Sequence, residues 1–436
     1  MPDLTLTDRL LAVFEALDIS RAHIATQTPS DISKLVEASP ERIAGIVLLA
    51  PPRMDPTPFV RHASDVLYIA PAGGTLGRTA KTILPQMPNA QLVTLDGYDA
   101  ESWDDIAVDR SDVADVMSGH LSSVASVESI NGKEISGEVA GIRYHACGHG
   151  PTLVLTPLSF APSQWLPLLP VLSQHFRVVT LSGPHLGMLA LLEQRAALTG
   201  WRNMCAGAFS ALNLQSKQRV LEVGCGSGAI ARQFVQHTTG RNPLTAIDLS
   251  PYLLGEARHA AQSLGLEDRV DFVLASAEEL PFDSDAFDAA YSVTVFEECN
   301  AERAISELMR VVRPGGNVAI IVRAIDLTQW WNLPISPEIR AKIEIPAGSV
   351  APNGVATAAL YDLATAAGLK PSHMYPYIVA SETTSGPVFE FPEAHALAQL
   401  TSEEQTAYQA AKEEAVKSGT IFLTRGHHCF IGQVPK

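Results

Sequence analysis

Hydrophobic and polar positions along the first part of the chain predict helices that alternate with buried strands. A helical apolar spacing over 6–17 precedes a short apolar run at 22–26, and a continuous apolar run follows at 43–50. Further runs lie at 65–70 and 91–95. Because strands that are apolar throughout are buried on both faces, their alternation with helices predicts a parallel α/β sheet.

A second alternating pattern occupies the rest of the chain. Its apolar runs lie at 219–223, 244–248, 270–274, 289–292, 317–322, 372–379 and 419–432, and its helical patterns at 252–264, 301–312, 355–368 and 401–418. The last run is predicted as an antiparallel strand. Since 436 residues exceed the usual size of one domain, we predict two domains, 1–190 and 191–436.

The composition is that of a globular protein with apolar material for two cores. Hydrophobic residues make up 46% and charged residues 18% of the chain. The formal net charge of −16 argues against nucleic acid or an anionic membrane as the main partner. No apolar run approaches the roughly 20 residues of a membrane span. The N-terminal pattern carries Asp3 and Asp8 and does not read as a signal peptide.

The cysteines are scattered and form no CxxC pair, which is typical of a reduced, cytoplasmic protein. They are Cys147, Cys205, Cys225, Cys299 and Cys429. His145, Cys147 and His149 alternate as metal ligands on a strand would. However, Gly148 and Gly150 predict a turn there and no fourth ligand follows, so we predict no metal site.

The order of elements in 1–125 resembles the second half of an α/β-hydrolase, most clearly in the segment ASPERIAGIVLLAPP at 38–52. That family's G-x-S-x-G elbow would fall at 26–30, where both glycines are absent and Pro29 follows the nucleophile position. No carboxylate follows the acid strand at 71–74, and the histidine position falls at Asp99 or Ala100. The resemblance therefore implies this fold without hydrolase activity.

Residues 137–190 resemble the first half of the same fold, with its opening hairpin and third strand at 142–157. Where active members carry His-Gly at the oxyanion hole, this chain has Thr156 and Pro157. The halves 1–125 and 137–190 thus occur in reversed order. We predict that they form one circularly permuted, non-catalytic α/β-hydrolase-like domain; the alternative is two separate remnants.

A glycine-rich turn, VLEVGCGSG at 220–228, joins the first strand of the second domain to a helix. Glycines at such a turn let the backbone approach a ligand closely, and the helix start offers free N–H groups. The next strand ends in Asp248, a carboxylate that can accept from both ribose hydroxyls. Because Ala229 also completes a G-x-G-x-x-[GA] pattern, a dinucleotide site is an alternative.

The whole succession resembles a class I S-adenosylmethionine (SAM)-dependent methyltransferase, in the small-molecule branch that includes ubiquinone/menaquinone methyltransferases. The resemblance rests on four motifs in the family's order: VLEVGCGSG, AIDLSPYLLGEAR, AEELPFDSDAFDAAYS and ISELMRVVRPGG. It covers 220–323 closely and about 195–436 in outline, and it implies a Rossmann-like seven-stranded sheet. The third and fourth motifs do not belong to the dinucleotide pattern.

The resemblance also implies which residues contact SAM. The glycines would pass under the cofactor, Glu222 would hold its amino end, and Asp248 would bind the ribose hydroxyls. Leu249 would lie against the adenine, whose edge Ser276 would contact as a weaker acceptor than the family's frequent aspartate. The full set of implied positions is Glu222, Gly224, Cys225, Gly226, Gly228, Asp248, Leu249, Ser276, Ala277 and Ser292.

Two residues are candidate general bases. In the resembling family the segment that matches 292–300 borders the methyl group, and relatives frequently carry histidine where Glu298 stands. A solvated carboxylate at a helix start is the alternative for Glu298. His428 in the last strand is the second candidate, as a base or hydrogen-bond partner in the acceptor site.

We therefore predict a methyltransferase that transfers a methyl group from SAM to an O, N or C atom of a small organic molecule. The first domain is predicted to contact substrate or to form a dimer interface, so a homodimer is considered. The alternatives are a SAM-binding sensor or interaction protein without turnover, and an inert scaffold that keeps its glycines only for the turn.

Overall fold

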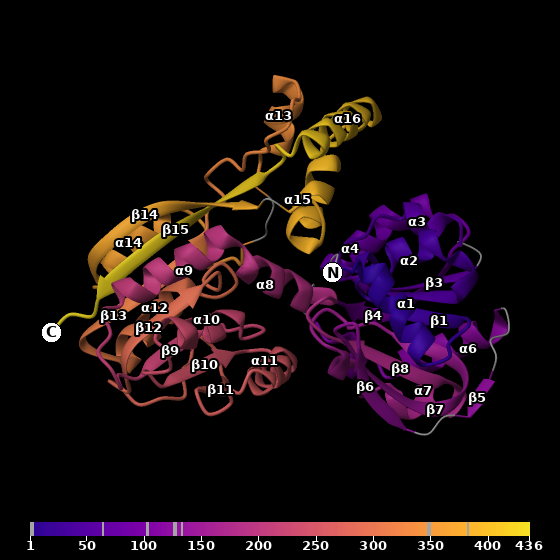
Figure 1. The fold of residues 1–436 in the computed structure, drawn as a ribbon, viewed down its shortest axis with the longest axis horizontal. Coiled ribbons are helices and arrows are strands. Elements are labelled where there is room, and N and C mark those ends of the chain that lie inside the picture. The colour runs from indigo at the N-terminus through magenta and orange to yellow at the C-terminus, as the bar shows by residue number, and fades with distance from the viewer. Residues whose placement is uncertain are drawn as a thin grey trace. The chain divides into compact units, whose positions relative to one another are not determined.

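The computed structural model describes residues 4–62, 65–101, 104–124, 129–131, 134–346, 350–381 and 383–436. The chain divides into two compact units, Met1–Ala190 and Leu191–Lys436. Each unit contains its own sheet, as Figure 1 shows. We call them unit 1 and unit 2 and describe each by itself.

Unit 1 is built on one sheet of eight strands. They are β1 (Ala22–Thr26), β2 (Ile43–Leu49), β3 (Val66–Gly73), β4 (Gln91–Asp99), β5 (Ser129–Asn131), β6 (Ile135–Val139), β7 (Ile142–Leu155) and β8 (Arg177–Ser182). Strands β4, β3, β2 and β1 follow one another in parallel, and β1 continues the sheet by pairing with β7, with His23 opposite Leu153. The two sequence halves therefore share one sheet, which is the pairing that a joined domain requires.

Strand β7 acts as two strands in succession. Its first part pairs antiparallel with β6 and β8. The register changes at Gly148 and Gly150, which both have positive φ, and residues 152–155 then run alongside 177–180 in the same direction. A Cβ at Gly148 would overlap the backbone of Phe176, so glycine is needed there. Residues 143–148 and 152–155 therefore pair with the same residues of β8 while running in opposite directions, so the chain reverses at these glycines and the predicted turn is confirmed.

Helices cover both faces of the unit 1 sheet. They are α1 (Leu6–Ala16), α2 (Ser33–Ala38), α3 (Thr57–Val60), α4 (Gly74–Ile83), α5 (Ile106–Asp109), α6 (Val113–Ser123) and α7 (Leu169–His175), with 3-10 turns at Pro29–Asp31, Pro40–Arg42, Leu84–Gln86 and Pro162–Trp165. Alternate residues of β2 point to opposite faces. Ile46 and Leu48 pack in the core with α1 and α2, whereas Val47 and Leu49 pack with α6 and α7.

Unit 2 contains a seven-stranded sheet of mixed direction. Its strands are β9 (Val220–Val223), β10 (Leu244–Asp248), β11 (Val270–Leu274), β12 (Phe287–Val293), β13 (Val312–Arg323), β14 (Lys370–Ser381) and β15 (Leu423–Gln433). The spatial order is β11-β10-β9-β12-β13-β15-β14. Strands β9 to β13 are parallel, and β15 is antiparallel to both of its neighbours. This Rossmann-like arrangement agrees with the sequence prediction, including the antiparallel last strand.

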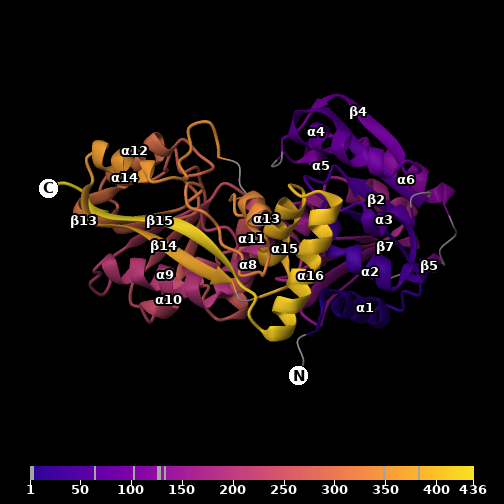
Figure 2. The ribbon, with the colours of Figure 1, turned by 90° about the horizontal axis from the view of Figure 1, so that it is seen from above.

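The helices of unit 2 are α8 (Gly187–Ala197, which begins in unit 1), α9 (Thr199–Ala211), α10 (Ala229–His237), α11 (Pro251–Ser263), α12 (Ala301–Val311), α13 (Pro337–Ile343), α14 (Ala359–Ala366), α15 (Pro387–Leu397) and α16 (Ser402–Ser418). Figure 2 shows α12 and α14 on one side of the sheet and α9 and α10 on the other. In β13, Ala319 and Ile321 pack with α9, α10 and α11, whereas Val318 and Ile320 pack with α12 and α14 on the other face.

Three helices of unit 2 form a separate small core beyond the strand ends (Figure 1). Helices α13, α15 and α16 enclose Trp331, which is fully buried and packs against the rings of Phe389 and Tyr408. The indole N–H of Trp331 donates to the carbonyl oxygen of Ile343 at 3.2 Å. This added helical layer comes from the segments that follow β13 and β14.

Within the described parts of the chain, no helix has the length and apolarity needed to cross a bilayer. The same parts contain no group of three or more metal-ligating side chains. His145 Nδ1 instead lies 2.9 Å from Ser136 Oγ, on the neighbouring strand β6. All five cysteines are free thiols.

Candidate functional site

The turn between β9 and α10 has a backbone that requires its glycines. Gly224, Gly226 and Gly228 have φ values of 76°, 53° and 72°, in the left-handed region that side chains disfavour. A Cβ at Gly224 would overlap the side chain of Val295, and one at Gly226 would lie 3.1 Å from Leu192 Cδ1. The loop 224–228, called the glycine loop below, thus has a left-handed backbone at its three glycines and close neighbours on two sides.

The end of strand β10 fixes the glycine loop. The N–H groups of Gly224 and Cys225 both donate to the carbonyl oxygen of Ile247 at 2.8 Å. Asp248 Oδ2 accepts from Gly226 N–H at 2.7 Å, and its Oδ1 accepts from Ser250 N–H at 2.9 Å. Burial raises the pKa of Asp248, although these backbone donors oppose the shift. The predicted ribose carboxylate therefore lies directly at the loop.

Glu222 is enclosed on the face of β9 that packs against α9 and α10. It is 2% exposed, and its Oε2 accepts a hydrogen bond from Tyr291 Oη at 3.0 Å. Its Oε1 makes no hydrogen bond to any described residue. Burial raises the pKa of Glu222 to about 8. The carboxyl is therefore largely protonated at neutral pH, and a nearby cation would favour its ionisation.

The predicted adenine contacts share the edge at which β10 and β11 end. Asp248 pairs with Leu274 in the sheet, and Ala275 N–H donates to the Asp248 carbonyl oxygen at 3.1 Å. Leu249 follows with its side chain 73% exposed, an apolar surface of the kind that a flat ring covers. The Ser276 hydroxyl accepts from Glu278 N–H at 3.1 Å, and Ala277, between them, is half-buried.

Two predicted contact residues have buried side chains. Ser292 is fully buried, and its hydroxyl donates to the Val223 carbonyl oxygen at 2.9 Å. Cys225 is 5% exposed and packs in the core beneath α10, where burial raises the pKa of its thiol well above the usual value. These side chains hold the strand and loop in place, so contact with a ligand at either position falls to the backbone.

The segment after β12 contains two adjacent glutamates with different surroundings. Glu298, the first predicted base, is ion-paired with Arg323 through Nη2 and Oε1 at 2.8 Å, and its side chain is 41% exposed. Glu297 is fully buried, its Oε1 accepts from the Arg323 N–H at 2.5 Å, and burial raises its pKa to about 7. Sequence reasoning missed Glu297, because an acidic pair at a strand end does not show which side chain turns inward.

His428, the second predicted base, is held on both ring nitrogens. Its Nε2 lies 2.8 Å from Asp326 Oδ1 and its Nδ1 lies 3.0 Å from Tyr361 Oη. The side chain is 3% exposed. Because both ring nitrogens are hydrogen-bonded within the protein, neither is available to the methyl acceptor. We therefore do not assign His428 the role of base. Its neighbour His427 points to the opposite face of β15, where its ring packs edge-on to Trp201 at 5.0 Å.

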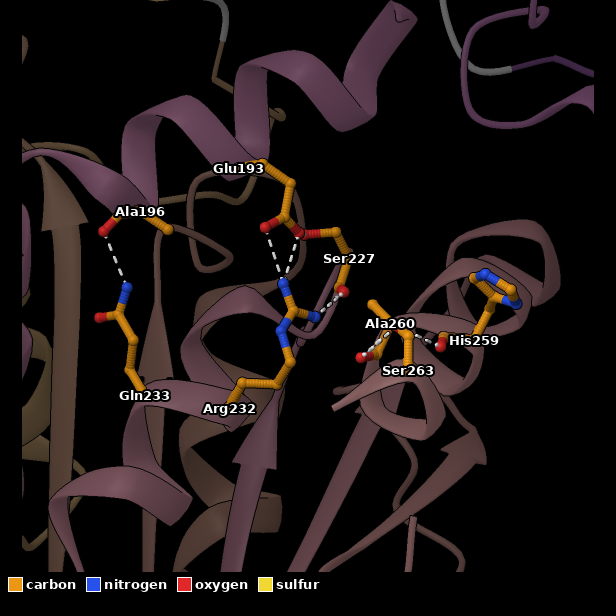
Figure 3. A network of polar contacts seen from close by, with 8 residues as sticks. All are labelled: Glu193, Ala196, Ser227, Arg232, Gln233, His259, Ala260 and Ser263. Atoms are coloured by element: carbon orange, nitrogen blue, oxygen red, sulfur yellow. Dashed lines mark hydrogen bonds and ion pairs between the residues drawn. The ribbon is translucent and has the colours of Figure 1, made fainter. Parts of the chain in front are cut away.

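Helix α8 is fastened to the glycine loop by a network of polar contacts (Figure 3). Glu193 Oε1 accepts from the Ser227 hydroxyl at 2.6 Å, and both Glu193 oxygens accept from Arg232 Nη2 at 2.8 and 2.7 Å. Arg232 Nη1 also donates to the Ser227 carbonyl oxygen at 2.8 Å, and Gln233 Nε2 donates to the Ala196 carbonyl oxygen at 2.7 Å. No short sequence motif marks this network, because its members come from two helices and the loop.

Loss of the Glu193 carboxylate is expected to destabilise unit 2. Glu193→Ala leaves the Arg232 side chain, only 10% exposed, without its counter-ion. We expect the free energy of unfolding to fall by about 2 kcal/mol. This loss is smaller than for a fully buried ion pair, because Glu193 is partly exposed. For a unit of this size, the unfolding temperature should fall by roughly 4–8 °C in a thermal scan. Glu267→Ala, at an exposed position of the same unit, is the control, and an unchanged Glu193→Ala curve would contradict the expected role.

Comparison with known proteins places this site in a recognised domain. Residues 221–320 match the family model described as "Methyltransferase domain". This matched segment begins in β9 and extends into β13, so it includes the glycine loop, Asp248 and the acidic pair at 297–298.

Similar curated proteins carry related names. A ubiquinone/menaquinone biosynthesis C-methyltransferase of Brucella anthropi is 39% identical over 97 residues, which are 22% of this chain and 37% of that protein. A sterol 24-C-methyltransferase of Gibberella zeae is 33% identical over 106 residues, 24% of this chain and 27% of the relative. The methyltransferase GfsG of Streptomyces halstedii is 34% identical over 113 residues, 26% of this chain and 40% of the relative. The chain thus spans 27% to 40% of the length of these relatives.

Proposed function

We propose, from the premise that residues 221–320 form a SAM-dependent methyltransferase domain, that the whole protein transfers a methyl group from SAM to an O, N or C atom of a small organic molecule. The observation that carries this proposal is the hydrogen bond from Gly226 N–H to Asp248 Oδ2. It brings the ribose carboxylate and the glycine loop to one point at the carboxyl edge of the sheet, where α/β folds bind ligands.

The residues at this edge fit SAM. At Gly224 and Gly226 the loop carries no side chain of its own, and the positions that a Cβ would take lie against the side chains of Val295 and Leu192, so the loop backbone is free of side chains of its own where a ligand would pass. Asp248 would accept from the ribose hydroxyls, Leu249 would cover the adenine, and Glu222 would face the cofactor's ammonium group. Bound at these residues, SAM would supply an electrophilic methyl group together with a thioether leaving group that keeps the C–S electron pair.

The protein's own part in the reaction is alignment, exclusion of water and, for some acceptors, removal of a proton. An acceptor O–H or N–H must lose its proton, and a base is most effective when its pKa lies near the working pH. The raised pKa of Glu297, about 7, suits that task better than the ion-paired Glu298. We therefore extend the proposed base from Glu298 to the pair 297–298.

For unit 1, we propose a non-catalytic α/β-hydrolase-like domain that contacts the acceptor or a second copy of the chain. Support comes from the elbow position, where structural hydrogen bonds engage the side chains. The Thr28 hydroxyl donates to Asp31 Oδ2 at 2.7 Å, and Gln27 Oε1 accepts from both the N–H and the hydroxyl of Ser159. We expect no ester hydrolysis by the full chain above that of a heat-denatured sample, and light scattering will show whether it dimerises.

The proposed activity is tested by turnover. The full chain is incubated with SAM and a metabolite extract, and release of S-adenosylhomocysteine is measured together with the mass of any new product. Extract-dependent release that Asp248→Ala abolishes supports the proposal. Binding of SAM without release in any extract favours the sensor, and failure of the wild-type chain to bind SAM would overturn both.

A further inference from the structure

Four cationic or titratable side chains from three elements of unit 2 lie together near the carboxyl ends of β12 and β13. Arg195 comes from α8, Arg323 ends β13, and Arg425 and His427 come from β15. Arg323 is paired with His427 in the sheet, and Arg195 Cζ lies 4.6 Å from the centre of the Trp201 ring that also packs against His427. We call Arg195, Arg323, Arg425 and His427 the cationic cluster.

The cationic cluster has more positive than negative charge. Its nearest carboxylates, Glu297 and Glu298, are both ion-paired with Arg323. Among the described residues, no carboxylate lies within ion-pair distance of Arg195 or Arg425, and Arg425 Nη2 donates to the Val388 carbonyl oxygen at 3.1 Å.

The surplus charge persists at neutral pH. Burial lowers the pKa of both Arg195 and Arg425 to about 10, so both remain charged, and each lies partly open to solvent. Partly enclosed guanidinium groups without a counter-ion lower the stability of the fold. A protein keeps such groups where a ligand supplies the missing negative charge.

Unpartnered buried atoms surround the same cluster. Glu297 Oε2, Trp201 Nε1 and His427 Nδ1 have no hydrogen-bond partner in the described structure. Their residues are 0%, 3% and 2% exposed. Because buried polar atoms in native proteins are nearly always paired, several orphans in one place indicate a site for a polar ligand.

The cationic cluster lies beside the glycine loop but farther along the sheet. Val295 packs against Gly224, and Glu297 follows only two residues later, while Leu192 of α8 lies against Gly226. Strand β15 is three positions from β9 in the sheet order, a separation of about 14 Å at the usual strand spacing of about 4.8 Å. The cluster is therefore placed for a second molecule rather than for the cofactor's own carboxylate.

We propose that the methyl acceptor carries an anionic oxygen group, a carboxylate or a phosphate, which binds between Arg195 and Arg425. This inference rests on the proposed function, because it assigns the acceptor's chemical class within the same site. Guanidinium groups suit either anion through paired N–H donors, and Trp201 Nε1 supplies one more donor. Glu297 Oε2, which has no hydrogen-bond partner in the described structure, remains available to take a proton from the acceptor.

The test uses the full chain saturated with S-adenosylhomocysteine, so that the cofactor carboxylate already occupies its own site. Benzoate, inorganic phosphate and the neutral benzamide are then titrated by calorimetry. We expect one or both anions to bind at least about tenfold more tightly than benzamide, and which anion binds distinguishes a carboxylate from a phosphate acceptor. Equal binding of benzoate and benzamide with no binding of phosphate would overturn the proposal.

Variants of the arginines localise the anion. Arg195→Met and Arg425→Met should weaken anion binding at least about tenfold, whereas Arg425→Lys, which keeps the charge and guards against misfolding, should retain most of it. Arg202→Met, at an exposed position on α9, is the matched control. Unchanged anion binding in both methionine variants would overturn the proposal.

The cofactor's affinity separates this inference from the proposed function. S-adenosylhomocysteine should bind Arg195→Met and Arg425→Met as it binds the wild-type chain. If its affinity falls with that of the anions, the arginines hold the cofactor's carboxylate and the acceptor assignment is wrong. Failure of the wild-type chain to bind S-adenosylhomocysteine at all would instead count against the proposed function.

Discussion

Asp248→Ala is expected to weaken the binding of S-adenosylhomocysteine by about 100-fold in a calorimetric titration, from two lost charge-assisted hydrogen bonds worth about 1.5 kcal/mol each. Two effects act in the same direction. The variant loses the carboxylate proposed to accept from the ribose hydroxyls, and it removes the acceptor that holds Gly226 N–H at 2.7 Å. The glycine loop would then lose one of its ties to β10, and the cofactor would have to order the loop as it binds.

The control for this result is Asp271→Ala. Asp271 lies on the neighbouring strand β11 with its side chain exposed, so its loss removes one negative charge from the same unit without touching the loop. The affinity of Asp271→Ala for S-adenosylhomocysteine should match that of the wild-type chain. Binding by Asp248→Ala within about threefold of the wild-type value would show that the cofactor does not use this carboxylate.

The fold of unit 2 and the position of the glycine loop beside Asp248 could be predicted because their signals are local. Strand β10 is apolar until it ends in Asp248, and the glycine loop contains its own conformational requirement. Residues 313–316 show the same for a strand start. β13 is bounded by Val312, but its pairing with β12 shifts between Val312 and Asn317 and Gly315 has a φ of 79°, so regular pairing begins at Asn317, where the strand was predicted to start.

The proposed anion site could not be predicted in the same way, because its residues are dispersed. Arg195 and Arg425 come from opposite ends of the unit 2 sequence, and neither belongs to a motif. The pair His427 and His428 illustrates the difficulty. Alternation along a strand predicts that the two rings point to opposite faces. Which face holds the site depends on Trp201 of α9 on one side and Tyr361 of α14 on the other.

For unit 1 as well, the sequence pattern predicted the strands but not all of their contacts. Alternation predicted its strands, and the structure joins the two halves of the sequence through the pairing of β1 with β7. The two glycines predicted the turn, but pattern alone could not show that it lies at the start of β8, where the backbone of Phe176 and His175 packs against Gly148 and Gly150. The reversal lets residues 143–148 and 152–155 pair with the same residues of β8 in opposite directions.

Binding of the cofactor is expected to release a proton from Glu222 below about pH 8. In the free protein, burial raises the pKa of this carboxyl from 4.5 to about 8, so it is protonated at pH 7. The ammonium group proposed to face it favours the ionised form. The affinity for S-adenosylhomocysteine should therefore rise with pH by up to about tenfold per unit and level off above pH 8. Calorimetry at pH 7 in PIPES and in Tris, whose ionisation enthalpies differ, measures the released proton.

Glu222→Gln should abolish both the proton release and the pH dependence of cofactor binding while keeping the hydrogen bond from Tyr291 Oη.

The free energy of unfolding should also depend on pH through Glu222. Because the folded pKa lies above the unfolded one, the folded state binds more protons between about pH 4.5 and 8, and the wild-type free energy of unfolding falls as pH rises through this range. Glu222→Gln should show a smaller fall, because Glu297, whose pKa burial raises to about 7, still contributes, whereas the exposed Glu302→Gln should retain the full fall. Equal proton release by the wild type and Glu222→Gln would place the ammonium group elsewhere and leave Asp248 as the main polar anchor of the cofactor.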